Sequence, residues 1–329
     1  MELSNSFEVN MLRSFFIYLS KATWARNTVT DWSVARRMAS RFVAGDQLED
    51  ALKVILMLNG RGINATLDHL GEHTTNAAEA LQATQDILKA LDGIQQAGVR
   101  ANVSIKLTQI GLAVDLALCA ENLRIILERA WNLGNFIRID MEDSPVTQVT
   151  LDFLRQMRHQ GYQNVGIVIQ AYLYRSSIDV EKLVKDCFKV RLCKGAYKES
   201  VEVAFPRKRD VDAAYDRQAE LLIRGALEQS CPVISEDGKI PPTPALATHD
   251  EKRILFAKAL AEKVGLPKQA LEFQMLHGIR RDLQEQLTAE GYPVRIYVPY
   301  GTQWYPYFMR RLAERPANVW FMVSNFFRK

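Results

Sequence analysis

A helix near the end of the sequence carries polar side chains where a buried apolar stripe is usual. Tyr307, Arg310, Arg311 and Glu314 occupy positions i, i+3, i+4 and i+7, which share one face of a helix. Two adjacent arginines can bind a carboxylate or phosphate through paired hydrogen bonds, which a single lysine cannot match. This face is either solvated or an anion-binding surface. Its place directly after the last predicted strand favours anion binding.

A second candidate lies in a short apolar run, where Arg191 is flanked by apolar residues. A buried guanidinium is costly without a partner, so Arg191 must contact a ligand or a carboxylate. Just beyond it, Lys194, Gly195 and Ala196 offer a cation and open backbone amides, which suit a phosphate or an anionic ring system. A structural ion pair between Arg191 and Asp140 is the alternative.

Two further charged residues end neighbouring predicted strands. Lys106 ends one strand and Asp140 ends the next, so we expect each to perturb the pKa of the other. A plain salt bridge is the alternative reading of this pair. A lysine at a strand end also permits Schiff-base chemistry, at Lys106 or at Lys194.

Short apolar runs alternate with helix-length segments along most of the chain, and most of the runs end in a polar residue. This alternation predicts the α/β class and a (β/α)8 TIM barrel, whose chemistry lies at the carboxyl ends of the strands. The expected strands are residues 64–68, 101–106, 136–140, 165–170, 190–194, 245–249, 271–274 and 294–297. The expected helices are residues 76–96, 114–133, 146–160, 178–185, 211–229, 251–264, 278–289 and 303–314.

The chain divides around this barrel into three parts. We expect an N-terminal helical extension at 1–60, a catalytic barrel at 61–315 and a C-terminal tail at 316–329. No apolar run reaches the roughly 20 residues that a membrane span needs. Both ends of the chain are apolar, so they either pack on the barrel or contact a membrane surface.

Composition excludes several classes of protein. With 42 basic and 38 acidic residues, the net charge of +4 gives no reason to expect a nucleic-acid partner. The four cysteines have no CxxC spacing and the five histidines no HxH or HExxH spacing, which favours reduced thiols in a cytoplasmic protein and no metal. No GxGxxG or GxxxxGK[ST] motif is present, so neither of these nucleotide-binding folds is expected.

Nine sequence motifs together resemble proline dehydrogenase, the stand-alone bacterial type of this flavin enzyme. The resemblance covers about residues 60–320, and the set is highly specific although any one motif alone would be weak. The motifs are LDHLGE at 67–72, SIKL at 104–107, RIDMED at 138–143, VIQAYLYR at 168–175, VRLCKGAYKE at 190–199, ATHD at 247–250, EFQMLHG at 272–278, RIYVPYG at 295–301 and YFMRRLAE at 307–314.

The resemblance implies a distorted barrel that holds FAD, with its eighth helix over the barrel mouth. It implies that Arg310 and Arg311 bind the carboxylate of L-proline, with help from Lys106. Glu72 would pair with Arg310 to close the site. Three tyrosines would enclose the pyrrolidine ring: Tyr197, Tyr297 and Tyr307.

The same resemblance implies a set of cofactor contacts. Asp140 is similar to the carboxylate beside the flavin, and Arg191 to the residue near its reactive nitrogen, where a cation would stabilise the charge of the reduced ring. The other positions that match FAD contacts are Ile139, Gln170, Lys194, Gly195, Ala196, Thr248, His249 and Gln274.

The implied reaction moves a hydride from the ring carbon next to nitrogen to the flavin and yields Δ1-pyrroline-5-carboxylate. It is the first step of proline catabolism to glutamate, and its electrons would pass to a quinone-type acceptor. Such an acceptor fits a peripheral contact at the inner face of a membrane. Two other interpretations stay open, a Schiff-base lyase or aldolase and a non-catalytic binding module. A yellow protein that proline bleaches would distinguish the flavin enzyme from both.

Overall fold

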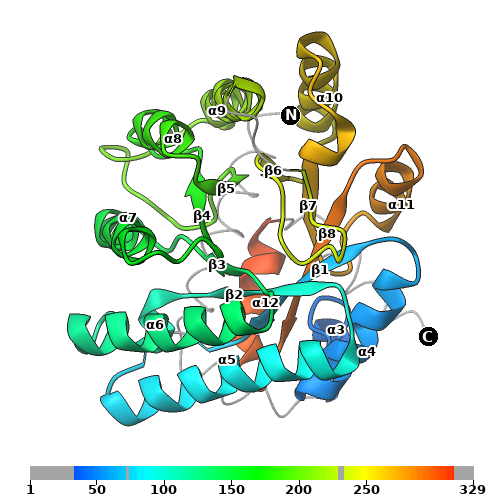
Figure 1. Ribbon diagram of the computed structural model, residues 1–329. Coiled ribbons are helices and arrows are strands. Elements are labelled where there is room, and N and C mark those ends of the chain that lie inside the picture. Colours follow the sequence, from blue (N-terminus) through cyan, green and yellow to red (C-terminus); the bar gives the residue numbers. More distant parts are fainter. Residues whose placement is uncertain (1–32, 72–73, 229–232, 315–329) are drawn as a thin grey trace, which may run out of the picture.

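Eight parallel strands close into a barrel in the computed structural model, which describes residues 33–71, 74–228 and 233–314 (Figure 1). Each strand pairs with the next along the chain, and the last pairs with the first. The (β/α)8 prediction is therefore confirmed, with strand ends within three residues of those expected. The strands are β1 (Asn64–His69), β2 (Ala101–Ile105), β3 (Ile137–Ile139), β4 (Val165–Gln170), β5 (Lys189–Cys193), β6 (Ala245–Ala247), β7 (Glu272–Leu276) and β8 (Val294–Tyr300).

Helices follow the strands and surround the barrel (Figure 1). Two more precede it, α3 (Ser33–Ala39) and α4 (Leu48–Asn59), and 3-10 turns lie at Leu107–Ile110 (η1) and Lys268–Ala270 (η2). The barrel helices are α5 (Ala77–Ala97), α6 (Leu116–Asn132), α7 (Ser144–His159), α8 (Ser176–Lys185), α9 (Lys208–Glu228), α10 (Glu251–Val264), α11 (Arg281–Ala289) and α12 (Trp304–Glu314).

The start of α11 shows how backbone conformation limits the sequence prediction. The helix was expected from Gly278 but begins three residues later, at Arg281. Gly278 has a φ of 76° and Arg280 a φ of 52°, and both values lie in the left-handed region that a right-handed helix cannot include. The turn after β7 therefore occupies the residues that the apolar pattern assigned to the helix.

The barrel wall has an apolar outer face and a polar inner face. Leu67 and Val103 belong to the buried apolar core that the helices cover, whereas the alternate positions along β1 and β2 are polar. The contact from Arg191 on β5 to Thr66 on β1, 3.3 Å from Nη2 to Oγ1, shows that these alternate residues face the interior. Branched apolar side chains usually fill the interior of such barrels. Here it holds Asn64, Thr66, Asp68, Asn102, Ser104, Lys106, Arg138, Gln170, Lys189, Arg191, Glu272, Gln274, Arg295 and Tyr297.

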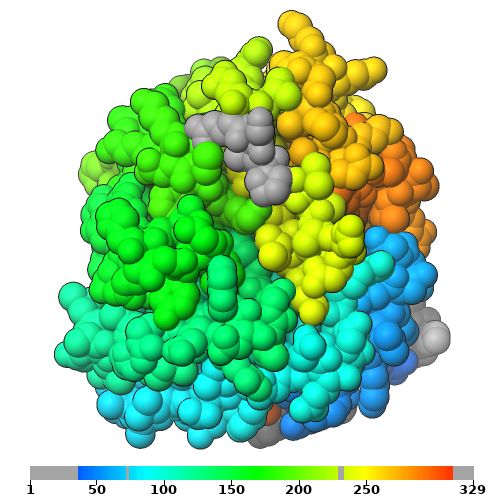
Figure 2. Space-filling view, viewed as in Figure 1, coloured from blue at the N-terminus to red at the C-terminus, as the bar shows by residue number. Residues whose placement is uncertain are grey.

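The connector before β6, residues 233–244, closes the amino-terminal end of the barrel. Its main-chain oxygens accept hydrogen bonds from interior side chains, at 3.0 Å from Asn102 to Lys239 and 2.9 Å from Lys189 to Pro241. In the space-filling view this connector, in yellow, covers the centre of the barrel (Figure 2). This connector, which contains Pro241, Pro242 and Pro244, thus forms the barrel floor.

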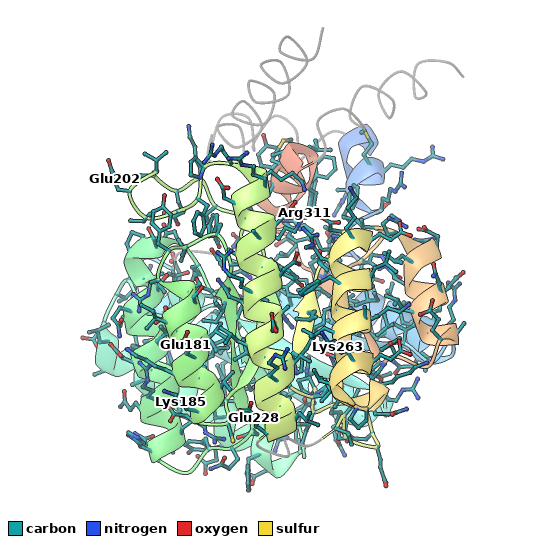
Figure 3. The ribbon with its side chains drawn as sticks, turned by 90° about the horizontal axis from the view of Figure 1, so that it is seen from above. Glu181, Lys185, Glu202, Glu228, Lys263 and Arg311 are labelled. Atoms are coloured by element: carbon teal, nitrogen blue, oxygen red, sulfur yellow. The ribbon has the colours of Figure 1, made fainter. Side chains whose placement is uncertain are left out.

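Helix α12 lies at the opposite end, where the strands end. It packs against α3 in an apolar cluster that includes Phe42, Trp304 and Phe308, and Tyr297 of β8 contacts this cluster. Arg311 lies on the face opposite Lys185 and Glu228, which end α8 and α9 at the floor side of the barrel (Figure 3). The eighth helix therefore covers the barrel mouth, as predicted. Among the helices that the structure describes, none is long and apolar enough to cross a bilayer.

A buried ion pair secures the floor, and its loss should be costly. Arg295 and Glu272 are fully buried, with Nε 3.0 and 3.1 Å from the two carboxylate oxygens. Glu272→Ala would leave a buried guanidinium without its counter-charge, so we expect a loss of about 3–5 kcal/mol in the free energy of unfolding. Urea denaturation measures this loss. Glu285→Ala, which breaks the exposed pair with Arg61, is the control and should change stability little. Equal losses in the two variants would contradict the assignment.

Candidate active site

Asp140 is the centre of a hydrogen-bond network at the carboxyl end of the barrel. Three side chains from three other strands donate to it: Ser104 Oγ at 2.8 Å, Arg191 Nη1 at 3.0 Å and Tyr297 Oη at 2.7 Å. The ion pair foreseen as an alternative for Arg191 therefore exists. Because the donors come from β2, β5 and β8, the network fixes the side chains of distant strands relative to one another.

Arg191 faces the interior and keeps part of its guanidinium available. Its Nη1 also donates to Ser104 Oγ at 3.1 Å, and its Cζ lies 5.5 Å from the centre of the Tyr297 ring. The buried Nε has no hydrogen-bond partner among the residues that the structure describes. Arg191 is thus held by Asp140 and still has a donor left for a ligand.

Lys106 joins this network from β2 through two carboxylates. Its Nζ lies 3.1 Å from Asp68 Oδ1 and 3.9 Å from Asp140 Oδ2. Burial raises the pKa of the Asp68 carboxyl, the Lys106 charge opposes this shift and the Asp140 charge adds to it. The expected proximity of Lys106 and Asp140 is present, but Asp68 is the nearer partner. Lys106 Nζ is thus engaged in an ion pair with Asp68, which disfavours the Schiff-base role considered for it.

Tyr297 provides a neutral hydroxyl above the ion pair. Burial raises the pKa of its phenol well above the usual value, and the neighbouring charge of Asp140 adds to the shift. The phenol therefore stays protonated at all ordinary pH values and can donate to Asp140. Tyr297 also borders the α12 cluster that contains Tyr307, so two of the three predicted ring-pocket tyrosines lie together.

The predicted arginine face of α12 is not simply solvated. Tyr307 is buried and Arg310 and Arg311 are half-buried. Arg311 Cζ lies 4.9 Å from the centre of the Tyr307 ring, so the guanidinium stacks on the phenol. Glu72, the predicted partner of Arg310, lies outside the described residues.

The strand ends of β4 and β5 carry several predicted cofactor contacts. Gln170 donates through Nε2 to the carbonyl of Met141 at 2.8 Å, while its buried Oε1 has no hydrogen-bond partner in the described part of the chain. Lys194 is held by Asp212 and, at 2.6 Å, by Asp250. The Lys194 charge is therefore largely compensated, unlike a free phosphate-binding lysine.

The next two residues of the β5 exit differ from Lys194. Gly195 has a φ of 118°, and a Cβ there would lie 2.4 Å from the Tyr172 ring, so only glycine fits. Ala196 is exposed and Tyr197 is half-buried. Backbone amides at this exit are thus close to the surface of the mouth, as an anionic ligand would require.

The remaining predicted contacts are spread more widely. His249 Nε2 accepts the Leu276 amide at 3.0 Å, and Thr248 Oγ1 accepts the Asp250 amide at 3.1 Å. Both directly follow β6, which ends at Ala247. Gln274 differs, because its Nε2 donates to Glu272 in the floor ion pair at 2.5 Å. The Ile139 side chain lies in the apolar core, which leaves only its main chain for a ligand.

Three members of the network were not in the predicted set. Asp68, Ser104 and Thr66 occupy inward positions on β1 and β2 and contact Lys106, Asp140 and Arg191. Period-two alternation along these strands is the signal that points to them, since polar residues repeat at every second position. Within the described residues no three potential metal ligands lie in one cluster.

Comparisons with known proteins agree with one another. The family model described as proline dehydrogenase matches residues 51–324. Proline dehydrogenase 1 of Bacillus subtilis is 41% identical over 323 residues, covering 97% of this chain and 100% of the relative. Proline dehydrogenase of Deinococcus radiodurans is 40% identical over 291 residues, covering 87% of this chain and 89% of the relative.

Solved structures show a similar barrel within larger proteins. The crystal structure of proline utilization A (PutA) from Bdellovibrio bacteriovorus, inactivated by N-propargylglycine, has a TM-score of 0.78 and 25% identity. It covers 94% of this chain, and this chain spans 37% of that protein. PutA from Bradyrhizobium japonicum, crystallised as the D778Y mutant, has a TM-score of 0.69 and 26% identity and covers 86% of this chain. This chain spans 31% of that protein.

A half-buried histidine after β7 should make stability depend on pH. Burial, with a contribution from Arg281, lowers the pKa of His277 from 6.5 to about 4. Between these values the unfolded chain binds a proton that the folded chain does not, so stability falls as the pH falls through this window. The loss approaches about 3 kcal/mol at pH 4.

His277→Gln removes the titrating group and should flatten this part of the pH profile, measured by urea denaturation at pH 7, 5.5 and 4. His159 is exposed, so His159→Gln is the matched control and should keep the wild-type slope. A wild-type slope in His277→Gln would show that other groups cause the acid sensitivity.

Proposed function

The chain belongs to the proline dehydrogenase family, of the stand-alone bacterial type, and we propose that the charged interior of its barrel binds FAD. Membership assigns it the oxidation of proline in proline catabolism. The proposal adds the cofactor, the residues that hold substrate and cofactor, and the path of the electrons. The observation that carries it is the network in which Arg191, Asp140, Tyr297 and Lys106 converge beside α12.

The residues present fit a flavin. Gln170 Oε1 and Arg191 Nε are a buried acceptor and a buried donor that lack hydrogen-bond partners within the described ranges. The inward positions in and directly after the strands hold five cationic side chains (Lys106, Arg138, Lys189, Arg191 and Arg295) and three carboxylates (Asp68, Asp140 and Glu272). An excess of positive charge and unsatisfied buried groups both favour an anionic, hydrogen-bonding cofactor.

We assign two groups of residues to FAD on this basis. Gln170 and Arg191 would contact the ring system from inside the barrel, with the main chain of Ile139 beside them. The β5 and β6 exits would hold the rest of the molecule, and Gln274 would need to leave Glu272 to take part. The residues at these exits are Lys194, Gly195, Ala196, Thr248 and His249.

The substrate lies between this interior and α12 in the proposed complex. Arg310 and Arg311 bind the carboxylate of proline from above, and Lys106 binds it from the strand side, where Asp68 keeps the ammonium oriented. Three cationic contacts fix the carboxylate, so the ring has one orientation before the reaction. The ring walls are Tyr197, Tyr297 and Tyr307. Pairing of Glu72 with Arg310 would close the site.

In the proposed reaction the protein positions the substrate and the cofactor and supplies a fixed positive charge near them. FAD, when bound, supplies an acceptor for the hydride that leaves the ring carbon next to nitrogen, giving Δ1-pyrroline-5-carboxylate. Arg191 provides a fixed positive charge for the negative charge that develops, and Asp140 holds its guanidinium in place. Ser104 and Tyr297 in turn hold Asp140. Preorganised charge of this kind needs no rearrangement during the reaction.

The later path of the electrons is proposed from the family alone. A quinone-type acceptor would take them onward, and a membrane-embedded acceptor would require peripheral contact between the protein and the bilayer. The apolar ends of the chain are the candidate contact, and both lie outside the described residues apart from α3 and α12.

A visible absorption spectrum tests the cofactor. We expect the purified protein to show flavin bands between about 370 and 450 nm, which disappear when L-proline is added without oxygen. Glycine, which has a carboxylate but no ring, is the control and should leave the bands unchanged. A colourless protein that takes up no FAD on reconstitution would refute the proposal.

The arginine pair can be tested separately from the cofactor. Arg310→Lys and Arg311→Lys keep the charge but lose the paired hydrogen bonds, so we expect KM for proline to rise about tenfold or more in each variant. Steady-state kinetics measures this rise, with Arg124→Lys on the exposed face of α6 as the control. Unchanged KM in both α12 variants would remove the carboxylate clamp.

A further inference from the structure

The loop between β5 and α9, residues 194–207, is fastened at both ends to the segment that follows β4. The Tyr172 amide donates to the Lys194 carbonyl at 2.9 Å, and the Phe205 amide donates to the Tyr172 carbonyl at 2.8 Å. The Tyr172 ring also packs directly on Gly195. The β5–α9 loop therefore has a fixed entrance and a fixed exit, and its middle carries Tyr197.

The middle of the β5–α9 loop has its own anchor, Glu199. One carboxylate oxygen accepts the Ser144 amide at 2.8 Å and the other accepts the Ser144 hydroxyl at 2.6 Å. Ser144 is the first residue of α7, and Asp143 before it makes no side-chain capping bond. A carboxylate from a distant loop thus replaces the usual local cap and meets the positive end of the helix dipole.

This contact joins two sides of the proposed substrate site. Glu199 follows Tyr197 by two residues, and Ser144 follows Asp140 by four. The charge of Glu199 is also a cause, second to burial, of the raised pKa of Tyr172, so the carboxylate lies close to the ring that packs on Gly195. Glu202 of the same loop lies on the face that carries Arg311 (Figure 3), which places the β5–α9 loop at the barrel mouth.

We propose that Glu199 is a positioning residue for substrate binding, because its bond to the start of α7 holds the β5–α9 loop so that Tyr197 forms a wall of the ring pocket. This inference rests on the proposed role of Tyr197. Glu199 itself touches neither substrate nor cofactor in this arrangement. Loss of the contact between Glu199 and Ser144 would therefore weaken proline binding. The hydrogen bonds and ion pairs around Asp140 would remain.

Steady-state kinetics on five variants tests the link. We expect Glu199→Ala to raise KM for proline about tenfold with kcat within about twofold of wild type, and Ser144→Ala to raise KM about threefold. Ser144→Ala combined with Glu199→Ala should be no worse than Glu199→Ala alone, since both act through one contact. Tyr197→Ala should raise KM, and adding Glu199→Ala to it should raise KM little further.

Two controls separate positioning from helix stability. Asp115→Ala removes an exposed carboxylate that caps α6 by accepting the Leu118 amide at 2.7 Å, so it should lower Tm without changing KM. Glu199→Gln keeps an acceptor for the Ser144 amide and should give a smaller KM change in a protein that folds.

The result that overturns the proposal is a wild-type KM in Glu199→Ala and Glu199→Gln, or fully additive effects of Tyr197→Ala and Glu199→Ala. The flavin content of each variant is read from its spectrum. A wild-type protein that proline does not bleach would refute the proposed cofactor instead, so the two failures are distinguishable.

Discussion

The pairing of charges inside a closed barrel is the constraint on which this structure depends. A charge removed from water is costly unless it is compensated, and carboxylates compensate three of the interior cations at two levels. At the floor, Arg295 is paired with Glu272. Nearer the mouth, Asp140 compensates Arg191 and, with Asp68, Lys106. The same pairs that make the polar interior stable leave a few groups unsatisfied near the mouth, and those groups are the ones suited to a ligand.

The fold could be read from the sequence because its signals are local. Each strand is a short apolar run, and several helices end at glycines such as Gly98 and Gly134, whose φ values of 61° and 60° are left-handed. The arginine pair of α12 and the polar strand ends also follow from spacing alone. Residue spacing does not reveal which side chain each polar residue pairs with. Asp68 is the main partner of Lys106 only because of the register between β1 and β2. Gln274 is turned toward Glu272 by a contact that no local pattern encodes.

Contacts between successive loops explain how the mouth keeps its shape. Gln109 donates to the His69 carbonyl at 3.0 Å, and Thr108 donates through its amide to the Glu142 carboxylate at 3.1 Å. Glu199 binds Ser144 in the same manner. Each of these bonds joins a side chain of one loop to the main chain of another, so the loops form a connected rim. Loops that support a site in this way are more precise than loops that are free in solvent.

The connector beneath the barrel limits how a ligand can reach the barrel interior. Its carbonyl groups are bound by Asn102, Lys189 and Arg295, so displacing it would strip hydrogen bonds from two buried side chains and from a third that is partly buried. The connector therefore closes the amino-terminal end of the barrel. A ligand would therefore reach the interior from the opposite end, which α12 covers. A substrate and its product would then share one route, so the product would have to leave before the next substrate could bind.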